Sequence, residues 1–230
     1  MPGDDTVARR RAAALAGHRG DAAAARRATL DDDATVRAAA LGALARCDDL
    51  HVGDLERAAA DPHAVVRRRA AELIGHHGPR RSDSEDGAND GAADGPLDRV
   101  VEVLLADAAA TVIDAAAWAA GERWGLDDDG EPTGAPPEAL ALLVDHARAH
   151  DDALVRETCV AALGAIGDPA GEAAVIEAMG GPAVLRRRAV LALAAFDGPD
   201  AAAALRAALE DRDWQVRQAA EDLLDARPQP

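Results

Sequence analysis

The stretch Asp211-Arg212-Asp213-Trp214-Gln215-Val216-Arg217 decides the fold, because its last two residues return along the chain at nearly constant spacing. The valine-arginine pair recurs in Ala-rich sequence as Val36-Arg37, Val66-Arg67, Val155-Arg156 and Val216-Arg217, with Leu185-Arg186 as a variant. Aligned on this position, the units start at Val7, Val36, Val66, Val112, Val155, Leu185 and Val216. A fixed period predicts an all-α array of about seven repeats.

Two helices are expected in each unit. Apolar residues follow the aligned valine at helical spacing, as in Val36, Ala40 and Leu44, which predicts an inner helix. A shorter apolar stripe precedes it, as in Leu205 to Leu209, and predicts an outer helix. Recurrent Asp residues predict N-caps, and Gly17, Gly75, Gly121, Gly164 and Gly167 predict helix ends.

The acidic composition points to concentrated salt. The net charge is -17, and every one of the 25 basic residues is arginine. Molar salt shortens the Debye length to about 3 Å, so such a surface need not repel itself there.

Cys47 and Cys159 lie far apart in the sequence and are expected to be free thiols of a reducing compartment. No stretch approaches the ~18 apolar residues of a membrane span, so we expect a cytoplasmic protein. We also expect a monomer.

The expected organisation is a single repeat domain over residues 1–230. Two longer steps in the period indicate acidic flexible insertions at about residues 76–95 and 123–137. They are either solvated spacers or loops that border a binding surface.

The repeated motif resembles that of the HEAT-like repeats first described in phycobilin lyases, with the signature Asp-x-Asp-x-x-Val-Arg. Residues 211–217 match it fully and residues 31–37 nearly so. The resemblance covers essentially the whole chain and implies a right-handed α-solenoid with an armadillo-type superhelix.

The resemblance also implies a ladder of Asp and Arg side chains that pair within or between repeats. Its structural residues here would be Asp31, Arg37, Asp61, Arg67, Asp211 and Arg217. The motif lacks its Arg at Ala8 and Ile113, and its first Asp at His150 and Gly180. The ladder is therefore expected to be interrupted there, which would leave Arg156 and Arg186 for other contacts.

No enzymatic activity, cofactor or metal is expected. Deoxyhypusine hydroxylases resemble this family but carry His-Glu dipeptides, which this chain lacks. A bilin lyase remains an alternative, as does a nucleic-acid-binding or DNA-glycosylase-like HEAT protein, although the net charge opposes phosphate binding. His146 and His150 have the i, i+4 spacing of metal ligands, but their place at a helix end favours a dipole interaction.

Arginine triplets early in three inner helices are the candidate partner contacts. With one arginine of each triplet serving the ladder, the candidates are Arg10, Arg11, Arg68, Arg69, Arg187 and Arg188, to which Arg156 and Trp124 are added. Bidentate arginine contacts suit a protein partner that presents an acidic peptide or helix. The alternative is that these arginines are solvated or paired within the chain. The sequence thus favours a non-catalytic protein-binding scaffold that uses the concave face.

Overall fold

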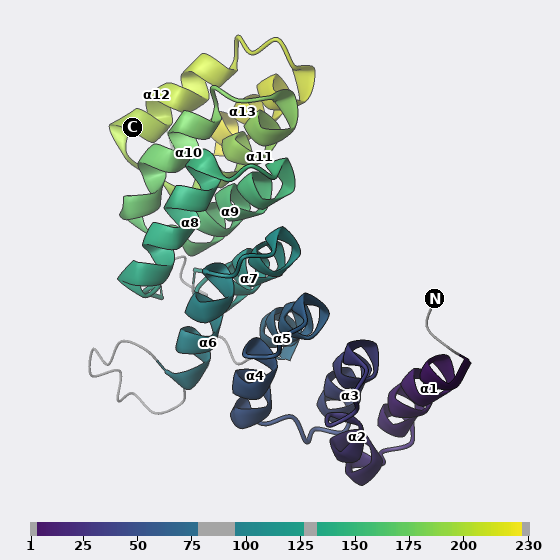
Figure 1. The fold of residues 1–230 in the computed structure, drawn as a ribbon. Coiled ribbons are helices and arrows are strands. Elements are labelled where there is room, and N and C mark those ends of the chain that lie inside the picture. The colour runs from purple at the N-terminus through teal and green to yellow at the C-terminus, as the bar shows by residue number, and fades with distance from the viewer. Residues whose placement is uncertain (1–3, 78–94, 127–132, 227–230) are drawn as a thin grey trace. The chain divides into compact units, whose positions relative to one another are not determined.

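The computed structural model describes residues 4–77, 95–126 and 133–226 (Figure 1). In these ranges 13 α-helices pack in sequence order as a HEAT-like solenoid, which confirms the predicted all-α fold. The helices are α1 (Asp4–His18), α2 (Ala22–Ala28), α3 (Ala34–Arg46), α4 (Val52–Ala59), α5 (Ala64–His77), α6 (Pro96–Leu105), α7 (Ala110–Arg123), α8 (Pro137–Ala149), α9 (Ala153–Ile166), α10 (Glu172–Ala178), α11 (Ala183–Ala192), α12 (Pro199–Ala208) and α13 (Trp214–Ala226). Short 3-10 turns, η2 (Pro169–Gly171) and η3 (Leu193–Ala195), flank α10 and α11.

The odd-numbered helices carry the aligned residue, which is Leu185 in α11 and valine in the others, and they are the inner helices. Val36, Val66, Val112, Val155 and Val216 are all buried. The even-numbered helices are the outer ones, and each precedes its inner partner in the chain. Seven inner helices therefore match the seven expected units.

The described residues form two compact units, and α7 contributes to both. The first unit holds α1 to α6 and α7 up to Ala119. Within it the inner helices α1, α3 and α5 pack in succession. Its small core residues allow close approach, as where Ala16, Ala25 and Leu44 meet from three helices.

The second unit holds the end of α7 and α8 to α13. The inner helices α9, α11 and α13 form one layer, and the outer helices α8, α10 and α12 form the other (Figure 1). Leu163, Ile166 and Leu205 lie between the layers and are fully buried. The expectation of one continuous domain over residues 1–230 stays a prediction.

The predicted helix starts are confirmed, whereas most of the predicted helix ends are wrong. The carboxylates of Asp33 and Asp152 accept hydrogen bonds from the backbone N–H groups of Thr35 and Leu154. Gly167 ends α9 with a φ of 68°, which favours glycine. By contrast, the other four predicted end glycines lie inside helices, namely Gly17, Gly75, Gly121 and Gly164.

These helical glycines let inner helices approach one another. A Cβ added at Gly164 would lie 2.6 Å from Cα of Ala192 on α11, and one at Gly17 would lie 2.8 Å from Cα of Ala43 on α3. The absence of a side chain is therefore required by packing between helices.

The two expected insertions fall largely on residues 78–94 and 127–132, outside the described ranges. The proposed boundary at residue 123 is wrong. Trp124 is fully buried, and the N–H of Leu126 donates to the carbonyl oxygen of Ala165 at 3.0 Å. Residues 123–126 thus belong to the folded repeat. None of the helices in the described ranges is long and apolar enough to cross a membrane.

Candidate interaction surface

The ladder is built from arginines whose guanidinium groups join two repeats. Nη1 of Arg37 donates to the carbonyl oxygen of Asp31, six residues earlier, at 2.8 Å. Nε and Nη2 of the same side chain donate to the two carboxylate oxygens of Asp61 in the next repeat, each at 2.8 Å. One edge of the arginine therefore holds its own helix start, and the other grips the following repeat.

The same arrangement recurs in both units. Arg67 donates to the carboxylate of Asp107 and to the carbonyl oxygen of Asp61. Arg186 donates to both carboxylate oxygens of Asp211 at 2.8 Å and to the carbonyl oxygen of Gly181 at 2.9 Å. The expected pairs within a repeat thus use a backbone oxygen, as Arg217 also does with Asp211, whereas the carboxylate serves the preceding repeat.

Each rung carboxylate also accepts a hydrogen bond within the loop before the inner helix that follows it. Asp61 and Asp211 accept hydrogen bonds from the N–H groups of His63 and Asp213. Burial raises the pKa of Asp61, but the hydrogen bonds from Arg37 and His63 outweigh it and lower the pKa. Hydrogen bonds from Arg186 likewise lower the pKa of Asp211. These carboxylates are therefore held in the charged form.

The interruption expected at Ala8 is wrong, and so is the expectation that Arg186 is available. Arg9 takes the place of the arginine missing at Ala8, and its Nε donates to Asp31 at 3.0 Å. Arg186, expected to be available, is only 4% exposed and forms the rung with Asp211. Gly180 does not release Arg186, because the carboxylate partner of each rung comes from the next repeat.

A rung is interrupted at Arg156. Its Nη1 donates to the carbonyl oxygens of His150 and Asp151, as in the other rungs. In the described ranges no carboxylate pairs with it, since the next repeat has Gly180 at the Asp position. His150 keeps the loop hydrogen bond of the missing Asp, because its Nδ1 accepts the N–H of Asp152 at 3.0 Å.

Most of the candidate partner arginines are engaged with carboxylates of the chain. Arg68 and Arg69 both pair with Glu72 on the same helix. Arg187 pairs with Asp213 and lowers the pKa of that carboxyl to about 2, while Arg188 lies 3.3 Å from Glu157. The triplets at residues 67–69 and 186–188 are therefore paired within the chain.

Arg10 and Arg11 lie exposed on α1. Trp124, considered as an exposed anchor, is instead 0% exposed. Its ring belongs to the core of the second unit and is excluded as a partner contact.

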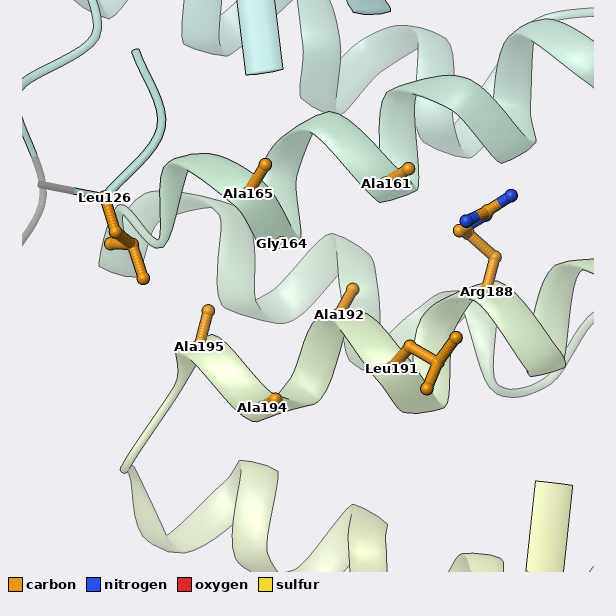
Figure 2. Close-up of a pocket in the computed structure, with 9 residues that line it drawn as sticks. All are labelled: Leu126, Ala161, Gly164, Ala165, Arg188, Leu191, Ala192, Ala194 and Ala195. Atoms are coloured by element: carbon orange, nitrogen blue, oxygen red, sulfur yellow. The ribbon is translucent and has the colours of Figure 1, made fainter. Parts of the chain in front are cut away.

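An open groove of about 350 Å³ lies between α9 and α11 in the second unit, and the turn η3 after α11 also lines it. Figure 2 shows small residues of the two helices facing one another, with Leu126 and Arg188 at opposite ends. The lining residues are Leu126, Ala161, Gly164, Ala165, Arg188, Leu191, Ala192, Ala194 and Ala195. The groove therefore offers an apolar surface with one cationic side chain at its rim.

Large apolar side chains lie exposed on the inner helices of the same unit. Leu154, Val184 and Leu191 are 56%, 55% and 54% exposed. Trp214 on α13 is 65% exposed. Sequence reasoning missed this set, although Leu154 and Val184 share the position directly before the aligned residue.

Sequence reasoning also missed pairs between outer helices. Arg26 on α2 donates to the buried carboxylate of Asp54 on α4 at 2.6 Å. Arg148 on α8 pairs with Glu177 on α10 at 2.7 Å. Asp54 could have been recognised from its place at the third position of α4. Its side chain accepts the N–H of His51 there, in a capping box.

A second open groove, of about 650 Å³, lies between the outer helices α10 and α12. Its rim is acidic, but Glu172 accepts the N–H of Ala201 and Glu177 pairs with Arg148. In the described part of the chain, no three ligating side chains gather as a metal site.

The model of the PBS lyase HEAT-like repeat matches residues 155–181 and 185–211. These two stretches begin at the aligned residues Val155 and Leu185, and they cover α9 to α12. These two stretches are PBS lyase HEAT-like repeats. The match thereby confirms the expected family of the repeats, and the Arg186 rung lies inside it.

Solved structures share the fold of this HEAT-like solenoid. Two crystal structures of engineered proteins from the Northeast Structural Genomics Consortium match it with TM-scores of 0.63 and 0.59 at 19% and 20% identity. Each match covers 89% of this chain, and 97% and 95% of the engineered chains. Human deoxyhypusine hydroxylase in complex with glycerol matches with a TM-score of 0.45 at 21% identity, over 96% of this chain and 80% of that chain. No curated protein matches the chain in sequence.

Proposed function

We propose that this protein is a non-catalytic cytoplasmic scaffold or adaptor, which binds a partner segment on its inner-helix face. The observation that carries the proposal is the groove between α9 and α11. Ala161, Ala165 and Ala192 leave space along it, so an apolar segment from a partner would contact the helices closely.

The exposed apolar side chains extend this surface. Leu191 lines the groove, while Leu154 and Val184 stand in the first turns of the two helices that form it. More than half of each side chain is exposed, so a partner would remove apolar area from water there. This supports protein binding, because nucleic acid is bound mainly through phosphate contacts.

The alternative of nucleic-acid binding or base repair needs a basic field. Arg187 and Arg188, at the inner face, are paired with Asp213 and Glu157, and the chain carries a net charge of -17. A surface neutralised in this way attracts phosphate poorly. The lyase alternative draws no support from the repeat match, which concerns residues that pack the helices.

Affinity capture in molar salt tests the proposal with two matched variants. Ala165→Arg places a long cation in the inner groove, and Ala203→Arg places the same side chain in the outer groove between α10 and α12. Both alanines are exposed on helices, so both variants should retain native helicity. We expect one stoichiometric protein to be captured by the wild type and by Ala203→Arg, and to be lost with Ala165→Arg.

Two results would reject the proposal. Capture that disappears after nuclease treatment would favour the nucleic-acid alternative. Capture that Ala203→Arg abolishes and Ala165→Arg leaves intact would move the binding surface to the outer helices.

A further inference from the structure

Arg156 is a ladder arginine that is oriented like the others but has no rung. In Arg37, Arg67 and Arg186, Nη1 binds a carbonyl oxygen of the loop before the same helix, which leaves Nε and Nη2 to the carboxylate. Nη1 of Arg156 makes the equivalent contact with His150. The remaining edge of its guanidinium group is therefore presented where the other three bind an aspartate.

The loop before α11 cannot supply that aspartate. Gly180 stands at the Asp position and has no side chain, and Pro182 stands two residues later and has no N–H. In the intact rungs, by contrast, the carboxylate binds the arginine and also accepts the N–H of the second residue after it. This loop therefore lacks both the rung carboxylate and the N–H group that would donate to it.

We propose that Arg156 binds a carboxylate of the partner, which takes the place of the missing rung aspartate. This inference rests on the proposed function and adds the chemistry of the partner segment. The segment would carry an Asp or Glu beside apolar residues, because Leu154 and Val184 lie exposed in the first turns of α9 and α11. The chain's own rungs show that this arginine edge selects a planar, bidentate acceptor.

The position of Arg156 also suits binding in concentrated salt. Its residue is half-buried, as Arg37 and Arg67 are, whereas Arg10 and Arg11 are exposed. Ion pairs that are partly removed from water are screened less by salt than exposed ones. A carboxylate is favoured over a phosphate group, since a dianion is repelled more strongly by a chain with a net charge of -17.

The first test uses acetate as the carboxylate probe. Potassium chloride is replaced by potassium acetate at constant molar ionic strength, and the Nε–H resonances of the arginines are followed by NMR. We expect the Arg156 resonance to shift with saturation, while those of Arg10 and Arg11 move only weakly. A response of Arg156 no larger than that of Arg10, or a stronger response to inorganic phosphate than to acetate, would overturn the inference.

Gly180→Asp tests the same position from within the chain. Gly180 does not have a positive φ, and an added Cβ would lie 3.3 Å from the carbonyl oxygen of Glu177, so the substitution requires a small local adjustment. The new carboxylate should form the missing rung, raise the melting temperature and remove the response of Arg156 to acetate. Gly180→Asn is the matched control without charge, and it should have none of these three effects.

Binding of the purified partner separates this inference from the proposed function. Arg156→Gln and Gly180→Asp should each weaken the affinity by at least about tenfold, with Gly180→Asn close to the wild type. If the partner binds both variants as tightly as the wild type, the role of Arg156 is wrong and the scaffold function stands. If no protein partner is captured while acetate still shifts Arg156, the scaffold function fails and the carboxylate site stands.

Discussion

Arg156 and Arg186 occupy the same place in successive repeats and differ in what lies opposite them. Arg186 meets the carboxylate of Asp211 with both oxygens engaged, whereas Arg156 faces a repeat with glycine at that position. The energetic role of a ladder arginine therefore depends on the next repeat rather than on its own.

Replacing these two arginines should affect stability unequally. Arg186→Ala leaves the shielded carboxylate of Asp211 without its partner, which should lower the free energy of unfolding by about 2–3 kcal/mol. Arg156→Ala removes contacts to backbone oxygens and should cost less than about 1 kcal/mol. Urea unfolding in molar salt measures both. Equal losses would contradict the assignment of Arg156 to an interrupted rung.

Acid should destabilise the protein through the paired aspartates. The pKa values of Asp61, Asp107, Asp211 and Asp213 are lowered in the folded chain, to about 2 for Asp213. Carboxylates with lowered pKa values stabilise the fold fully above the unfolded value of about 3.9, and this stabilisation is lost as the pH falls through the folded values. The free energy of unfolding should therefore drop between about pH 4 and pH 2.

Asp213→Asn serves as the control for the acid effect. Its stability at neutral pH should be lower, because Arg187 loses its charged partner, and its further loss below pH 4 should be smaller than that of the wild type. Parallel pH profiles for the two proteins would show that the Arg187–Asp213 pair does not contribute.

The residues of the ladder were predictable from sequence, but their pairing was not. The spacing of six between Asp31 and Arg37 favours a contact, and the structure makes it through the backbone oxygen. The carboxylate of Asp31 pairs with Arg9 instead. Which repeat supplies the carboxylate depends on how inner helices stack, which a sequence period does not specify.

At the scale of the helices, glycines decide how closely neighbours approach. Gly164 on α9 faces Ala192 on α11, and a Cβ there would lie 2.5 Å from the Cβ of that alanine. Sequence reasoning assigned this glycine to a helix end, which Gly167 provides three residues later. Both roles place glycine near the end of an inner helix, so position alone could not separate them.

Gly164→Ala should therefore destabilise the second unit. Forcing α9 and α11 apart costs about 1–3 kcal/mol, typical of overpacking. Gly53→Ala is the matched control, because its Cβ would meet only Nη1 of Arg57 at 3.6 Å, and a gain of up to about 0.5 kcal/mol is expected. The midpoints of urea unfolding compare the two. A neutral Gly164→Ala would contradict the close helix contact.

For the whole molecule, charge dominates the expected solution behaviour. A net charge of -17 on 230 residues favours expansion wherever salt does not screen it. The alternation of inner and outer helices was predictable from the period, because each repeat buries its stripe against its neighbours. The groove between α9 and α11 was not predictable, because an alanine on an inner helix is equally compatible with a core position and with a surface position.

Stability should rise with salt. The melting temperature should increase from millimolar to molar potassium chloride, because the Debye length falls to about 3 Å and repulsion among the acidic side chains is screened. Thermal melting of the helices, recorded at a series of potassium chloride concentrations, measures this. A melting temperature that is constant or falls with salt would contradict a protein adapted to concentrated salt.

Hydrogen–deuterium exchange of the chain with and without its purified partner, in molar salt, tests the binding surface most directly. The partner should slow exchange in peptides from α9 and α11, which form the groove and carry Arg156, with little change in α10 and α12. Slower exchange confined to α10 and α12, or no change in α9 and α11, would contradict the assignment of partner binding to the inner helices.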